Sequence, residues 1–198
     1  LVAAELIGAT PVIVVNKADL LDTESRSKLE QRLAIYATIA YSLLFISTRT
    51  TDGLKDLHQQ LKSHTSILVG QSGVGKSSLV QALLPDLDIR TGALSQVTGL
   101  GRHTTTVTML YHLPDGGDLI DSPGVRDFSL SPVAVDRLAQ GFREFRPYLG
   151  QCRFHNCRHA GEPGCAVQDA ARSGVINQRR LANYRELVRM MSSPGARS

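Results

Sequence analysis

GQSGVGKSS, at residues 70–78, is the stretch that decides the fold. It matches the pattern G-x-x-x-x-G-K-[ST], and it follows the apolar run TSILVG (65–70) and precedes the helical pattern KSSLVQALL (76–84), as that pattern requires. The glycines let successive backbone N–H groups point at a phosphate, and the helix N-terminus adds its positive dipole end. A flexible Gly/Ser turn is the alternative, and the flanking strand and helix disfavour it. The sequence therefore predicts a phosphate-binding loop.

The residues of this loop have separate expected roles. Lys76 is expected to bridge the β- and γ-phosphates in catalysis, and the Ser77 hydroxyl to bind Mg²⁺. The residues that we expect to bind the nucleotide here are Gly70, Gln71, Ser72, Gly73, Val74, Gly75, Lys76, Ser77 and Ser78. Further along, DLIDSPGVRDF (118–128) places Asp121 at the end of an apolar strand, where it suits Mg²⁺ directly or through water. Gly124 follows, and its N–H suits the γ-phosphate; alone, such a sequence is a common strand-to-turn.

A second motif, before the phosphate loop, is expected to read the base. Asn16-Lys17-Ala18-Asp19 follows the strand-like run PVIVV (11–15). The Asp19 carboxylate can accept the N1–H and 2-amino hydrogens of guanine, whereas adenine offers no such pair of donors. Asn16 is expected to brace the loop, and the Lys17 stem to lie over the base. ISTRT (46–50) also follows a strand, and a backbone N–H at Ser47 or Thr48 suits guanine O6.

The base-reading motifs precede the phosphate loop, which is the reverse of the usual GTPase order, and the full order of motifs is a rotation of the usual one. In a parallel sheet the loops at the carboxyl ends of the strands converge on one crevice, whatever the order in which the chain visits them. Apolar runs at 11–15, 41–48, 65–70, 107–113 and 117–124 alternate with helical patterns at 22–39, 51–62 and 76–84. The sequence therefore predicts an α/β fold: a circularly permuted P-loop GTPase with a doubly wound, mostly parallel sheet.

The loop GLGRHTTT (99–106) lies where a GTPase keeps the threonine that closes on Mg²⁺. Thr105 is our first choice and Thr106 the second; otherwise the threonines start the next strand. Many GTPases place a glutamine after the acidic-turn glycine to orient the attacking water, but here that residue is Val125. We therefore expect His103 to supply the catalytic water-positioning group, the alternative being a solvent-exposed loop histidine.

All three cysteines fall within fourteen residues, in the spacing C-x4-C-x-H-x5-C. Thiolates and imidazole are ligands that zinc prefers, and four protein ligands define a structural site. Cys152, Cys157 and Cys165 are expected to bind one zinc ion with a histidine, either His159 or His155. Reduced buried thiols are the alternative. We predict a small, mainly helical zinc-binding module at 137–198 and a GTPase domain at 1–136.

Charge is uneven along the chain, whose formal net charge is +4. Residues 137–198 hold 11 arginines and 4 acids, whereas residues 1–136 hold 14 acids and 11 Lys and Arg. In the helical pattern 176–191, the arginines are expected to lie largely away from the apolar face, and to meet RNA phosphate or simply solvent. These are Arg179, Arg180, Arg185 and Arg189.

No run approaches the roughly 18 apolar residues of a membrane span, and the first residues given lack the basic region, apolar core and cleavage site of a signal peptide. We expect a cytoplasmic, monomeric protein without a membrane partner. The start at Leu1, in a helix tail, suggests that residues upstream are missing.

Motifs across nearly the whole chain resemble those of the ribosome small-subunit-dependent GTPases of bacteria. They are NKADLL, GQSGVGKSSLV, GRHTTT, LIDSPGVRDF and YLGQCRFHNCRHAGEPGCAV. Ser122 and Thr48 stand where Thr and Ala are usual in that family, and its members usually carry an N-terminal oligonucleotide-binding barrel that is not in this chain. The resemblance favours His159 over His155 as the fourth zinc ligand.

The resemblance implies hydrolysis of GTP to GDP with Mg²⁺, coupled to binding and release of the small ribosomal subunit, through its rRNA, during late maturation. The alternative is a zinc-stabilised RNA-binding module with GTP as a regulatory ligand and little catalysis. A third reading, a kinase built on the phosphate loop, is disfavoured by the guanine-reading Asp19.

Overall fold

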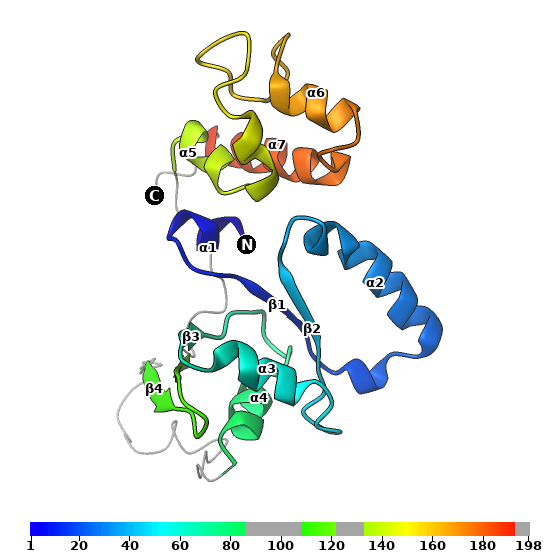
Figure 1. The fold of residues 1–198 in the computed structure, drawn as a ribbon, viewed down its shortest axis with the longest axis vertical. Coiled ribbons are helices and arrows are strands. Elements are labelled where there is room, and N and C mark those ends of the chain that lie inside the picture. Colours follow the sequence, from blue (N-terminus) through cyan, green and yellow to red (C-terminus); the bar gives the residue numbers. More distant parts are fainter. Residues whose placement is uncertain (86–107, 122–132, 193–198) are drawn as a thin grey trace, which may run out of the picture. The chain divides into compact units, whose positions relative to one another are not determined.

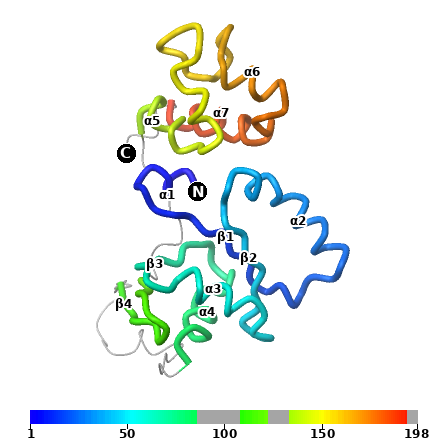
Figure 2. The backbone as a smooth tube through the Cα atoms, in the orientation of Figure 1, coloured from blue at the N-terminus to red at the C-terminus, as the bar shows by residue number. Residues whose placement is uncertain are grey.

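The computed structural model describes residues 1–85, 108–121 and 133–192, and they form two compact units (Figures 1 and 2). One unit consists of residues 13–32 and 43–128 and contains the α/β elements. The other consists of residues 1–12, 33–42 and 129–198 and is mainly helical. The chain therefore passes between the units four times, and two N-terminal segments belong with the C-terminal helices.

The strands of the α/β unit lie where the apolar runs predicted them, although each is shorter than its run. They are β1 (Val12–Val15), β2 (Ser42–Phe45), β3 (Thr65–Ile67), β4 (Met109–His112) and β5 (Asp118–Asp121). β3 pairs parallel to β5, with Thr65 opposite Asp118, and β4 pairs antiparallel to β5. In the described part of the chain β1 and β2 form a separate two-stranded sheet. The expected single sheet is thus divided into two groups of strands.

The strands are short because their last residues turn into loops. The Ile46 N–H still donates to the Val15 carbonyl (2.9 Å), but the next N–H, from Ser47, donates to Asp52 within a turn (2.9 Å). Gly53 closes this turn with φ +69°, and a Cβ at that position would lie 2.2 Å from the Phe45 carbonyl oxygen. Only glycine fits there. The loop after β2 is therefore held tightly against the strand that it leaves.

Three helices complete this unit: α2 (Thr23–Ala37), which continues into the other unit, α3 (Leu54–Leu61) and α4 (Lys76–Leu83), together with the short 3₁₀ helix η1 (Ala18–Leu20). α2 begins after Asp22, whose carboxylate accepts the Ser25 N–H (2.7 Å) and caps the first turn. α3 and α4 each bury leucines at helical spacing. The core that they share consists of Ile46, Leu54, Leu57, Leu61, Leu79, Val80, Leu83, Leu84, Leu113 and Leu119.

The helical unit contains α1 (Val2–Leu6), α5 (Val135–Gln140), the 3₁₀ helix η3 (Arg143–Tyr148), α6 (Ala166–Arg172) and α7 (Gln178–Ser192). Its core contains three fully buried aromatic rings among aliphatic side chains. The rings of Phe142 and Phe145 stack with their centroids 4.8 Å apart, and Tyr184 meets both edge-on at 5.4 and 5.2 Å. Leu181, Tyr184 and Val188 form the apolar face of α7, as the spacing predicted.

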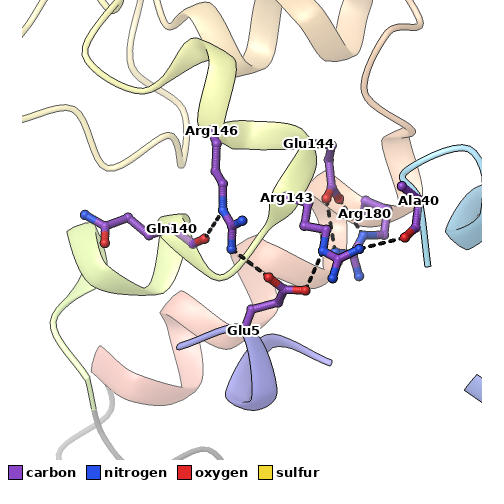
Figure 3. Close-up of polar contacts among 7 residues, drawn as sticks. All are labelled: Glu5, Ala40, Gln140, Arg143, Glu144, Arg146 and Arg180. Carbon is purple, nitrogen blue, oxygen red and sulfur yellow. Dashed lines mark hydrogen bonds and ion pairs between the residues drawn. The ribbon is translucent and has the colours of Figure 1, made fainter. Parts of the chain in front are cut away.

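Arg180 does not lie on the polar face of α7, so that expectation was wrong. Its side chain is only 5% exposed and pairs with Glu144, also 5% exposed, at 2.5 Å from Nε to Oε1 (Figure 3). The guanidinium lies 4.7 Å from the centre of the Phe142 ring. Arg180 is adjacent to Leu181 in the sequence and therefore lies at the border of the apolar face. There the buried Glu144 carboxylate and the face of the Phe142 ring stabilise its guanidinium inside the unit.

A second buried carboxylate joins three segments of the helical unit (Figure 3). Glu5 on α1 accepts from Arg143 Nε (2.5 Å) and from a terminal nitrogen of Arg146 (2.7 Å), and its side chain is 6% exposed. Arg143 also donates to the Ala40 carbonyl at 2.7 Å. These contacts explain why residues 1–12 and 33–42 pack with the C-terminal helices.

The Arg180–Glu144 pair gives the first testable prediction. Arg180→Met alone should lower the free energy of unfolding by about 3–5 kcal/mol, because it leaves a buried carboxylate unpaired. Adding Glu144→Leu should recover more than half of that loss. Urea denaturation measures both, with Arg179→Met on the exposed side of α7 as a control that should change stability by less than about 0.5 kcal/mol. A double variant as unstable as the single one would show that unpaired charge is not the cause.

Candidate nucleotide site and metal centre

The base-reading motif and the phosphate loop are in direct contact, although 56 to 58 residues separate their contacting positions. Lys17 follows β1 with φ +62°, and its Nζ donates to the Gly73 carbonyl at 2.8 Å. The Asn16 side-chain amide donates to the Val74 carbonyl at 3.0 Å. Asn16 also accepts the Lys17 N–H through Oδ1 at 2.8 Å, so the turn itself is fixed. The structure thus joins the two motifs that the sequence separates.

Gly75 lies at the closest approach of the two loops. Its φ is +95°, and a Cβ built there would lie 2.4 Å from Asn16 Nδ2. Gly73, with φ +80°, has nothing within 4 Å of an added Cβ. Gly75 is therefore required both for its backbone conformation and for the space that Asn16 occupies.

The two base-reading loops are tied together by Asp19 and Ser47. The Ser47 hydroxyl, fully buried, donates to Asp19 Oδ1 at 2.6 Å and accepts the N–H groups of Arg49 and Thr50, each at 3.1 Å. Asp19 itself is exposed, so its carboxylate is oriented while remaining open to solvent. The sequence predicted only a backbone role at Ser47 and Thr48. It did not predict that the Ser47 hydroxyl would bond to Asp19, because a serine after a strand has no distinctive pattern.

Lys76 lies at the start of α4, and its Nζ donates to the carbonyls of Gly70 (2.5 Å) and Gln71 (2.9 Å). Gln71, Ser72, Ser77 and Ser78 are exposed around it. Asp121 ends β5, the strand that pairs with β3, and β3 leads into the phosphate loop. Lys76 therefore begins the helix that follows the phosphate loop, and Asp121 ends the strand that pairs with the one preceding it. His103, Thr105, Thr106 and Gly124 lie outside the described residues.

The second candidate site is a cluster of one histidine and three cysteines in the helical unit. One ligand atom from each of Cys152, Cys157, His159 and Cys165 lies within 4.8 Å of the others, so the four could hold one metal ion. His159 Nδ1 is 3.5, 3.6 and 3.4 Å from the sulfurs of Cys152, Cys157 and Cys165. All three thiols are free. The structure places His159, and not His155, in this cluster.

The loop around the cluster is held by Glu162. Its carboxylate accepts the N–H groups of Arg158 (3.0 Å), Ala160 (2.9 Å) and Gly161 (3.0 Å). Burial acts to raise the pKa of Glu162, but these backbone donors outweigh it and lower that pKa to about 2. His159 itself has φ +57°, an unusual conformation that this network holds in place. Burial lowers the pKa of His159, which favours the neutral ring that a metal requires.

The RsgA GTPase family model matches residues 1–131 of this chain. The chain belongs to the RsgA GTPase family. Proteins named small ribosomal subunit biogenesis GTPase RsgA are similar to it: the one from Chromohalobacter salexigens is 54% identical over 188 residues, covering 95% of this chain and 55% of that protein. The one from Vibrio cholerae serotype O1 is 48% identical over 194 residues, covering 97% of this chain and 50% of that protein. The chain thus spans about half the length of these relatives.

Two solved structures share the fold of this RsgA-family chain. YjeQ from Thermotoga maritima is 34% identical, with a TM-score of 0.77, and the match covers 96% of this chain and 62% of that one. YloQ, described as a circularly permuted GTPase, is 27% identical with a TM-score of 0.74, covering 96% and 61%. The fold is therefore the circularly permuted GTPase that the motif order predicted. Among the described residues, no helix is long and apolar enough to cross a membrane.

The contact between Gly75 and Asn16 can be tested with two glycine substitutions. Gly75→Ala should destabilise the chain more than Gly73→Ala, by about 1 kcal/mol, because both replace a glycine of positive φ but only the first displaces a hydrogen-bonded amide. Urea denaturation measures the difference. If both variants lost the same free energy of unfolding, the Asn16 side chain would be able to move away at no cost, and its contact with the phosphate loop would contribute little to stability.

Removing the metal should unfold much of the helical unit. A strong chelator at neutral pH is expected to reduce the helical circular dichroism signal, as is Cys165→Ser, whereas His155→Ala should leave metal content and helicity unchanged. Burial raises the pKa of the Cys157 thiol to about 12, so metal binding must release its proton, and metal affinity should rise with pH. Metal analysis and proton-release titration measure these effects. A chelated chain with full helicity would contradict a structural metal.

Proposed function

We propose that this chain hydrolyses GTP and that its nucleotide state sets its binding to the small ribosomal subunit during late maturation, in the cytoplasm and as a monomer. The observation that carries the proposal is the joining of three loops: Lys17 and Asn16 bond to the phosphate loop, and Ser47 bonds to Asp19. A base reader fixed to a phosphate cradle is needed for a guanine nucleotide and not for a phosphate alone. The names of the relatives support the ribosomal partner.

In this proposal Asp19 accepts the two guanine hydrogens, and its bond from Ser47 holds it in position to do so. A backbone N–H at Ser47 or Thr48 meets guanine O6. The backbone of residues 70–78 and the Lys76 ammonium hold the phosphates. Ser77, Asp121 and Thr105 bind Mg²⁺, which supplies charge neutralisation at the phosphates. His103 positions the water, and Gly124 contacts the γ-phosphate.

We further propose that the metal is zinc and that it is structural. Tetrahedral zinc with Zn–S near 2.3 Å and Zn–N near 2.05 Å separates nitrogen from sulfur by about 3.6 Å and two sulfurs by about 3.8 Å. The cluster has nitrogen–sulfur separations of 3.4 to 3.6 Å and a Cys152–Cys165 sulfur separation of 3.9 Å, and all four ligand atoms lie within 4.8 Å of one another, which is compatible with this ion. Four protein ligands leave no position for a catalytic water. Residues 1–136 then serve as the GTPase domain and 137–198 as a zinc-binding module that contacts rRNA.

Steady-state GTP hydrolysis with and without small ribosomal subunits tests this function, with ATP and large subunits as controls. Stimulation by the small subunit alone is expected.

Asp19→Asn should weaken GDP binding by about tenfold or more, because a carboxylate that accepts two hydrogen bonds is replaced by an amide whose NH₂ faces a donor. His103→Ala should reduce turnover with little change in GTP affinity. Binding of GTP without multiple turnover would favour a GTP-regulated RNA-binding module instead.

A further inference from the structure

The loop between the first two cysteine ligands, at residues 153–156, presents an exposed aromatic ring next to a cation. Phe154 is 43% exposed, although a phenylalanine is usually buried. The Arg153 guanidinium lies 5.4 Å from the centre of its ring. His155 and Asn156 follow and are exposed as well. The loop lies in the yellow segment between η3 and α6 (Figure 2).

The position of this loop is fixed although it has no regular secondary structure. Cys152 and Cys157 anchor its two ends at the metal centre. The Arg153 N–H donates to the Gly164 carbonyl at 2.9 Å, and the Cys157 N–H to the Phe154 carbonyl at 3.2 Å. Gly164 has φ +69°, and a Cβ there would lie 2.9 Å from Arg153 Cβ, so glycine allows the two segments to lie together. Phe154 is therefore held at the surface by its backbone.

The segment that carries the ring is basic in sequence. Residues 151–161 contain Arg153 and Arg158 and no acid. The nearest acid in sequence, Glu162, is engaged by three backbone N–H groups. Within the described residues, no carboxylate forms an ion pair with Arg153 or Arg158. Both guanidinium groups thus remain available to an anionic partner.

We propose that Phe154 and Arg153 form a stacking platform for an unpaired RNA base, and that Arg158 contacts a neighbouring phosphate. This proposal rests on the proposed ribosomal function and names the RNA feature that the zinc-binding module would bind. Exposed aromatic rings and guanidinium planes stack on bases of single-stranded RNA, whereas the bases of a duplex are stacked within the helix and not available. We favour RNA because one partner then provides both a base for the exposed ring and phosphates for the two guanidinium groups.

The experiment uses the whole 198-residue chain and a fluorescein-labelled, unstructured 12-nucleotide RNA, with the same RNA annealed as a duplex for comparison. Anisotropy at several KCl concentrations gives the affinity and its salt dependence. Phe154→Ala should weaken binding of the unpaired RNA by about 10- to 100-fold at an unchanged salt slope, since stacking involves no counterion release. Phe154→Trp, which keeps an aromatic ring, should bind the unpaired RNA about as tightly as the original chain. Arg158→Gln should instead reduce the salt slope by about 0.7.

Val175→Ala is the matched control, because Val175 is an apolar residue of the same unit with 66% exposure and no adjacent cation in the sequence. It should leave RNA affinity unchanged. Metal content and circular dichroism of each variant verify the fold. Duplex binding should not depend on Phe154.

Two results would overturn the platform. One is equal affinity of the original chain and Phe154→Ala for unpaired RNA, including the case in which neither binds. The other is a Phe154→Ala defect in small-subunit binding without any defect on RNA, which would assign the ring to a ribosomal protein. GTP hydrolysis stimulated by small subunits, measured with the original chain, separates these outcomes from failure of the proposed function.

Discussion

The nucleotide site depends on one constraint: side chains after β1 must reach carbonyls of a phosphate loop that follows β3. The Lys17 ammonium and the Asn16 amide meet this constraint by donating to successive carbonyls, those of Gly73 and Val74. The same two contacts therefore hold the predicted base-reading turn and the predicted phosphate loop against each other. Gly75 is part of this constraint, because any side chain there would occupy the place of the Asn16 amide.

This constraint explains why a permuted chain order is compatible with function. The contacts join the ends of strands, and strand ends are neighbours in space whatever order the chain follows. Permutation changes which loops are covalently continuous but not which groups face one another. The cost of closing a loop grows only slowly with its length, so the 56 to 58 residues between the contacting positions are a small obstacle.

Strand positions, the phosphate loop and the cysteines of the candidate metal cluster could be predicted from sequence because each has a local signal, whereas the choice of His159 over His155 came from the family resemblance. PVIVV is a continuous apolar run rich in β-branched residues, the glycine spacing of residues 70–78 is specific, and cysteines near a histidine are rare by chance. The roles of Ser47, Arg180 and Glu162 could not be predicted. Ser47 bonds to Asp19, 28 residues away, and Arg180 bonds to Glu144, 36 residues away. No local sequence pattern predicts contacts over such separations. Likewise, nothing local shows that residues 1–12 and 33–42 pack with the C-terminal helices.

The helical unit shows how a segment without regular structure becomes rigid. Residues 152–165 contain no helix or strand, so their backbone donors need other acceptors, and Glu162 supplies two oxygens for three of them. That network in turn holds His159 at positive φ with Nδ1 toward the sulfurs. Bound structural zinc contributes about 10–16 kcal/mol in small zinc-binding domains, comparable to the whole stability of a typical protein. Residues 152–165 also pack on the apolar core of the helical unit through Cys152, Cys157 and Cys165, so a zinc ion held as we propose would add to contacts that this core and the Glu162 carboxylate already make.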